Sequence, residues 1–100
     1  MVKWANFVIT HVRYNQTETR IIKIKRRSDL GDKLGSPVER TRGQIVTAIG
    51  NGYTYVTATY ADNKWSKGDR VIRYNLEGEY FIRTDGNEKK SDNLRRLPKF

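Results

Sequence analysis

The chain has 100 residues, of which 36% are hydrophobic and 31% charged, and it contains no cysteine. A chain of this length is expected to form a single domain, residues 1–100, with one modest core. The lack of cysteine excludes disulfides, thiolate metal sites and a cysteine nucleophile. Twenty Lys and Arg against eleven Asp and Glu give a net charge of +9, which favours polyanionic partners. The alternative is that this charge only keeps the surface soluble.

Two strands and a connecting turn are predicted first. Residues 7–14 are rich in β-branched and aromatic residues, and residues 20–26 mix isoleucine with basic residues. Residues 15–19 are polar and would close an antiparallel hairpin. Strict alternation along the first strand would place Val8 and Val12 on one face and every second residue from position 7 to position 13 on the other.

The next predicted elements are a crossover and the one convincing helix. Residues 28–40 contain several turn formers and are expected to be irregular. Residues 41–52 form the helix, because Thr41 and Gln44 have the spacing of a capping box and glycines near the end can stop it. A helix this short needs a sheet to bury its apolar arc. The residues of that arc are Ile45, Val46, Ala48 and Ile49.

Three further strands are expected after the helix, at residues 53–60, 70–74 and 79–83. The polar residues 61–69 should form a loop that carries Trp65. Glu77 and Gly78 resemble a two-residue hairpin turn. The tail, residues 84–100, has no periodicity but contains apolar residues at intervals, so it is expected to dock on the domain. These apolar residues are Leu94, Leu97 and Phe100.

The predicted order is therefore β-β-α-β-β-β. This order indicates an α+β fold in which one short helix packs on a curved antiparallel sheet. A partly closed barrel is the alternative. No apolar run reaches the ~20 residues that span a membrane, and the N-terminal residues do not resemble a secretory signal. We therefore expect a cytoplasmic protein with no membrane partner.

Several short motifs follow one another along the chain. The predicted helix begins with Thr-Arg and ends in Ala-Ile-x-x-Gly, residues 83–85 read Arg-Thr-Asp, and residues 91–100 read Ser-Asp-Asn-Leu-x-x-Leu-Pro-x-Phe. In this combination the chain resembles, over nearly its whole length, a family of small bacterial domains of unknown function. The resemblance implies a compact domain found in bacteria and mobile elements, and it implies no activity. Gly50 stands where the family leads us to expect a charged residue.

The sequence offers little for catalysis. Its one histidine, His11, lies within the first predicted strand, and no nucleophile or orienting partner is apparent near it. We interpret it as a structural or surface residue. The chain has no phosphate-binding glycine loop, and its carboxylates are scattered singly. We therefore expect no enzyme activity, no cofactor and no metal site.

Binding is better represented. Lys23 and Lys25 should point away from the face that buries Ile22 and Ile24, and basic residues and aromatic rings together are typical of single-stranded nucleic-acid binders. The predicted function is a small basic domain that binds nucleic acid or another polyanion. The alternatives are a protein-interaction module, encoded by a phage or mobile element and directed at a host protein, and a pocket for a small anion such as a nucleotide. The candidate binding residues are Arg13, Lys23, Lys25, Arg26, Arg27, Trp65, Arg70 and Arg73.

Overall fold

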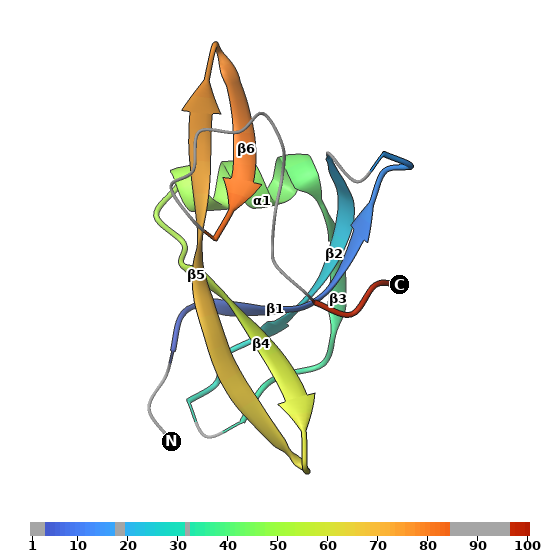
Figure 1. Ribbon diagram of the computed structural model, residues 1–100. Coiled ribbons are helices and arrows are strands. Elements are labelled where there is room, and N and C mark those ends of the chain that lie inside the picture. The colour runs from blue at the N-terminus through green and yellow to red at the C-terminus, as the bar shows by residue number, and fades with distance from the viewer. Residues whose placement is uncertain (1–3, 18–19, 32, 85–96) are drawn as a thin grey trace.

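The computed structural model of the chain describes residues 4–17, 20–31, 33–84 and 97–100. Within these residues, six strands and one helix form a mixed sheet with the helix against it (Figure 1). The strand order across the sheet is β3-β2-β1-β4-β5-β6. The elements are β1 (Phe7–Tyr14), β2 (Ile21–Ser28), β3 (Val38–Thr41), α1 (Arg42–Gly50), β4 (Tyr55–Ala61), β5 (Lys64–Leu76) and β6 (Glu79–Arg83).

The architecture confirms the predicted α+β class, with one short helix on a curved sheet. The helix α1 contacts β2 and β3 on one side and β5 and β6 on the other, so the sheet curls around it. Within the described residues the sheet stays open, with β3 and β6 as its edges.

Two details differ from the prediction. The segment 28–40, expected to be irregular, contains the short strand β3. The sheet is also not purely antiparallel, because β1 and β4 pair in parallel. The helix α1 is the crossover between β3 and β4, two strands that run in the same direction.

A β-bulge at Thr10 decides which residues of β1 share a face. The pairs Ile9–Arg26 and His11–Lys25 follow one another on β2, so Thr10 is an extra residue in β1. The strict alternation predicted for this strand is therefore wrong beyond Thr10. The side chains of β1 that pack into the core on the helix side of the sheet are those of Phe7, Ile9, Val12 and Tyr14.

A second register shift, at the other end of the same strand pair, affects Ile22. The shift makes Ile22 the extra residue on β2, and its side chain is 47% exposed. Ile21 and Ile24 are buried instead. The prediction that Ile22 shares the buried face of Ile24 is therefore wrong.

The helix begins with the predicted capping box. The Thr41 hydroxyl accepts a hydrogen bond from the Gln44 backbone N–H at 3.3 Å, and the Gln44 side-chain oxygen accepts one from the Thr41 N–H at 2.8 Å. Ile45 is fully buried, whereas Ile49 is only partly buried at the edge of the same cluster. Gly52 has a φ of 96° just after the helix, a conformation that glycine adopts without steric cost.

Buried side chains form two clusters, one on each face of the sheet, because neighbouring residues of β4 point in opposite directions. Tyr55 joins the larger cluster on the helix side, and Val56 joins the smaller one. The smaller cluster consists of Ala5, Val8, Val56 and Ala58, with Trp4, Leu34 and Trp65 packed around it.

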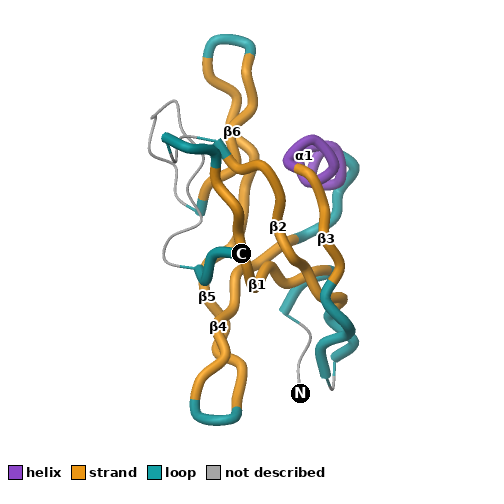
Figure 2. Tube along the Cα trace, turned by 90° about the vertical axis from the view of Figure 1, so that its right-hand side faces the viewer, coloured by secondary structure: helices purple, strands orange, loops and turns teal. Residues whose placement is uncertain are grey.

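The long strand β5 belongs to two hairpins whose tips project at opposite ends of the molecule (Figure 2). The first turn, at Asp62 and Asn63, has φ values of 52° and 63°, as a type I′ hairpin requires. The second turn, at Glu77 and Gly78, has φ values of 55° and 83° and confirms the predicted turn. The expected loop at residues 61–69 is wrong, since most of it forms the start of β5.

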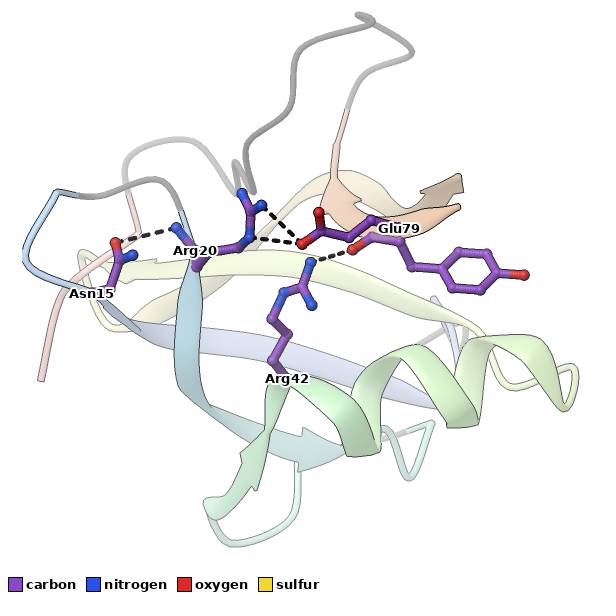
Figure 3. Close-up of polar contacts among 5 residues, drawn as sticks. Asn15, Arg20, Arg42 and Glu79 are labelled. Carbon is purple, nitrogen blue, oxygen red and sulfur yellow. Dashed lines mark hydrogen bonds and ion pairs between the residues drawn. The ribbon is translucent and has the colours of Figure 1, made fainter. Parts of the chain in front are cut away.

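Two arginines, Arg20 just before β2 and Arg42 at the start of α1, contact residues of β6 (Figure 3). Arg20 forms an ion pair with Glu79, with Nη2 and Oε1 2.8 Å apart. Arg42, the first residue of α1, donates a hydrogen bond to the backbone oxygen of Tyr80. Both guanidinium groups also lie over the ring of Phe81, at 4.5 Å and 5.8 Å from its centre. These contacts hold the edge strand β6 in its curled position.

The last described residues, 97–100, lie beside β1 where β4 no longer pairs with it. Val12 donates its N–H to the Pro98 backbone oxygen at 2.9 Å and accepts from the Phe100 N–H at 3.3 Å. Leu97 is buried in the larger cluster. The part of the tail prediction that concerns Leu94 falls outside the described residues.

Candidate polyanion-binding surface

Basic residues at the end of β2 alternate between the two faces of the sheet. Ile24 is buried in the helix-side cluster, so Lys23 and Lys25 point to the opposite face, and Arg27 follows them two residues later. These three residues form a row along the strand in steps of about 6.6 Å. Arg26 shares the face of Ile24.

Strand β1 adds a fourth cation to this row. Arg13 pairs directly with Lys23 in the antiparallel ladder. The Arg13 guanidinium carbon and the Lys25 Nζ lie 4.6 Å and 4.8 Å from the centre of the same Phe100 ring, so these two side chains converge on one surface. We call Arg13, Lys23, Lys25 and Arg27 the basic strip.

Two side chains of the basic strip are held in place by the protein itself. Arg27 donates from Nη1 to the Gly35 backbone oxygen at 2.9 Å, and its guanidinium carbon lies 5.4 Å from the centre of the Trp65 ring. Arg13 donates from Nε to the backbone oxygen of Phe100 at 2.7 Å. Ordering these side chains in advance lowers the entropy cost of binding an anion.

The basic strip has little acidic compensation. Within the described part of the chain, none of its four residues takes part in an ion pair. Glu39 of β3 is exposed and lies opposite Lys25 in the ladder, and it is the acidic residue that strand pairing places beside the strip. Like charges that face each other across a ladder, as Arg13 and Lys23 do, are destabilising.

His11 lies next to the basic strip, opposite Lys25. Its Nδ1 is 2.9 Å from the Thr10 hydroxyl oxygen. Burial, and then the positive charges of Lys25 and Arg27, lower the pKa of His11 below its ordinary value. The imidazole is therefore neutral near pH 7. Sequence reasoning treated His11 only as a structural or surface residue, and its position beside the strip depends on the bulge, which that reasoning missed.

Arg26 does not join the basic strip, although the sequence placed it there. Its guanidinium carbon lies 3.9 Å from the centre of the Phe7 ring, on the helix side of the sheet. Burial lowers the pKa of Arg26 and raises the pKa of the neighbouring Tyr55. The period of two along β2 separates this arginine from its basic neighbours.

Arg70 and Arg73 form a separate basic site on β5. Together with Tyr53 they line a pocket of about 350 Å³ beside the end of the helix. The Arg73 guanidinium carbon lies 4.4 Å from the centre of the Tyr80 ring, and its nitrogen atoms approach Gly50 closely. A cation at this position complements the partial negative charge at the C-terminus of α1.

Trp65 lies on a strand and not in a loop. It pairs with Tyr60 across the β4–β5 hairpin, and the two ring centres are 5.0 Å apart. Its ring is partly buried against the smaller cluster and faces Arg27. Trp65 on β5 thus lies next to Arg27 on β2, although β1 and β4 separate these two strands in the sheet. No local pattern in the sequence indicated this contact.

Comparison with known proteins places the chain in a family. Residues 8–98 match the family described as "Protein of unknown function (DUF3892)". The chain belongs to this family. The match agrees with the resemblance to domains of unknown function, and DUF3892 brings no activity with it. No curated protein and no solved structure matches the chain.

In the part of the chain that the structure describes, no group of three or more histidine or acidic side chains is arranged to hold a metal ion. No helix among the same residues combines the length and apolar character needed to cross a membrane.

Proposed function

We propose that this DUF3892 domain is a non-catalytic, cytoplasmic binding protein of bacterial or mobile-element origin, and that it holds nucleic acid or another polyanion on its basic strip. The observation that carries the proposal is the convergence of Arg13, Lys23, Lys25 and Arg27 on one face without an ion pair among the described residues. Phosphate oxygens would supply the missing counter-charge.

The arrangement of the strip supports a linear polyanion. Lys23, Lys25 and Arg27 follow one strand in regular steps, and Arg13 widens the row at one end. Such a row can follow a phosphate backbone, whereas a compact anion would contact only one or two of its members. Phosphate contacts of this kind release counterions, so the affinity should fall steeply with salt.

The test compares two double variants that each remove two positive charges. Lys23→Gln with Lys25→Gln alters the basic strip, whereas Arg26→Gln with Arg40→Gln alters the opposite face, because Arg40 pairs with buried Ile24. Both are titrated against fluorescent single- and double-stranded DNA and RNA at two salt concentrations.

We expect the strip variant to bind more weakly and its log–log salt slope to flatten by about 0.7–0.9 for each lost phosphate contact. The control variant should keep the parent's slope. Equal losses in the two variants would show that net charge alone drives binding. If the parent binds none of the nucleic acids at low salt, the proposal fails and a protein partner becomes the leading alternative.

The pocket beside Arg70 and Arg73 supports a second candidate, a small anionic ligand such as a nucleotide. Its volume of about 350 Å³, its two arginines and the Tyr53 ring suit a ligand with one anionic and one aromatic part. Arg70→Gln should then weaken nucleotide binding, measured by calorimetry, while the strip variant leaves it unchanged.

A further inference from the structure

A pocket of about 490 Å³ opens beside the basic strip. Its walls come from parts of the chain that are distant in sequence: Thr10 and His11 at the bulge of β1, Arg27 at the end of β2, and the Tyr60–Trp65 pair at the β4–β5 hairpin. Arg27 belongs both to this pocket and to the basic strip. A ligand that followed the strip would therefore reach the pocket without leaving the surface.

The hairpin wall of the pocket is aromatic. Tyr60 is 58% exposed, and its ring centre lies 5.0 Å from that of Trp65. Trp65 is in turn backed by the smaller cluster and by the Arg27 guanidinium. An exposed ring supported by a second ring offers a flat surface on which another aromatic group can stack.

The opposite wall is polar and suits the edge of a heterocycle. The Thr10 hydroxyl engages Nδ1 of His11 at 2.9 Å, which leaves Nε2 as the ring atom that can address a ligand. Because the imidazole is neutral near pH 7, it can donate or accept a hydrogen bond according to its tautomer. Thr59 adds a hydroxyl group to the lining.

We infer that this pocket receives one unstacked base of a single-stranded nucleic acid, whose phosphates lie on the basic strip. The inference deepens the proposed function and rests on it. A paired base in a duplex has both faces stacked and its edge occupied, so it could not enter the pocket without leaving the helix. A single strand presents its bases without that cost. The preferred ligand is therefore single-stranded rather than double-stranded.

The experiment uses the full chain and Tyr60→Ala, which removes the exposed ring. Tyr80→Ala is the matched control. Tyr80 is also an exposed tyrosine in a β-hairpin, but it pairs with Asn75 in the β5–β6 hairpin and contacts Arg73. Tyr60→Phe keeps the ring and serves as a rescue variant. The probes are a short fluorescent oligothymidylate, the same strand with abasic sites in place of its bases, and the corresponding duplex.

We expect Tyr60→Ala to lose about 5- to 150-fold in affinity for the oligothymidylate, the range that one stacked base provides. Its salt slope should stay that of the parent, because no phosphate contact is lost. The abasic strand should bind the parent weakly and should not distinguish it from Tyr60→Ala. Tyr60→Phe and Tyr80→Ala should bind the oligothymidylate like the parent.

Two results would overturn the inference while the proposed function stands: equal affinity of the parent for the abasic and the normal strand, or unchanged oligothymidylate binding by a folded Tyr60→Ala. A parent that prefers the duplex would overturn it as well. If the parent binds none of the three probes at low salt, the proposed function fails and the inference fails with it.

Discussion

Replacing Ile45 with alanine tests whether the helix is the centre of the fold. Ile45 is 0% exposed and packs in the cluster that also contains Ile24 of β2 and Ile82 of β6, so it joins both ends of the curled sheet. The substitution removes three carbon atoms, each worth about 0.8 kcal/mol of transfer free energy. Together with the cavity left behind, the loss of unfolding free energy should be about 2–5 kcal/mol.

Ile49→Ala is the internal comparison, because Ile49 lies one turn later but is only partly buried. Its loss should be clearly smaller than that of Ile45→Ala. Thr47→Ala, on the exposed face of the helix, is the control for helix propensity. Urea unfolding followed by circular dichroism measures all three. A loss below about 0.5 kcal/mol for Ile45→Ala, the size of an ordinary surface effect, would refute the packing argument, as would equal losses for the two isoleucines.

Two further predictions concern β5 and the pH dependence of binding. The register of β4 and β5 shifts between Val56–Arg70 and Ala58–Lys67, so Gly68 lies in a β-bulge opposite Thr57. A Cβ at Gly68 would clash with the Thr57 hydroxyl oxygen and would lie 3.0 Å from the Thr57 backbone oxygen, so Gly68→Ala should lower the melting temperature. In a chain that already carries Thr57→Ala, which removes the hydroxyl group, Gly68→Ala should still lower the melting temperature, because the backbone contact remains. Burial, and then Lys25 and Arg27, lower the pKa of His11. An anion that neutralises the two cations should raise this pKa again, so affinity for nucleic acid should increase as the pH falls through and below the ordinary pKa of histidine, in a titration that His11→Gln abolishes. The folded chain without ligand should show the opposite sign: its lowered His11 pKa contributes stability above the ordinary pKa that is lost as the pH falls, and His11→Gln should remove this loss.

Much of the local structure could be predicted because its signals are local. The capping box of Thr41 and Gln44 depends on two residues in one helical turn, and the Glu77–Gly78 turn depends on two adjacent residues that resemble the Asp-Gly pair of type I′ turns. The turn at Asp62 and Asn63 was not predicted, although aspartate and asparagine accept positive φ, because the polar residues around them indicated a loop. They are polar because the hairpin tip is exposed.

The features that were not predicted depend on distant partners. Strand β3 forms because it pairs with β2, whereas residues 28–40 have little strand propensity of their own. Ile22 is exposed because the pairing of β1 and β2 shifts by one residue, which only the two strands together determine. The candidate site shows the same division: alternation predicted that Lys23 and Lys25 share a face, whereas the approach of Trp65 to Arg27 requires the complete sheet order.

Arg26 shows a different limit. The period of two in a strand separates it from Lys25 and Arg27, but reading the basic residues as one continuous run grouped all of them on a single surface. In a run of charged residues on a strand, alternate residues therefore point to opposite faces of the sheet. The residues on one face are exposed, whereas those on the other face must pack against the core, as Arg26 does by stacking on Phe7.

The bulge at Thr10 links the stability of the sheet to the proposed site. A one-residue change of register moves every following side chain to the other face. Without the extra residue, Val12 would leave the core and Arg13 would enter it, away from Lys23. The single extra residue thus keeps Val12 in the core and Arg13 on the opposite face. It also places His11 in the wall of the pocket beside the strip. Because the core already requires the bulge, the fold itself places Arg13 and His11 at the proposed site.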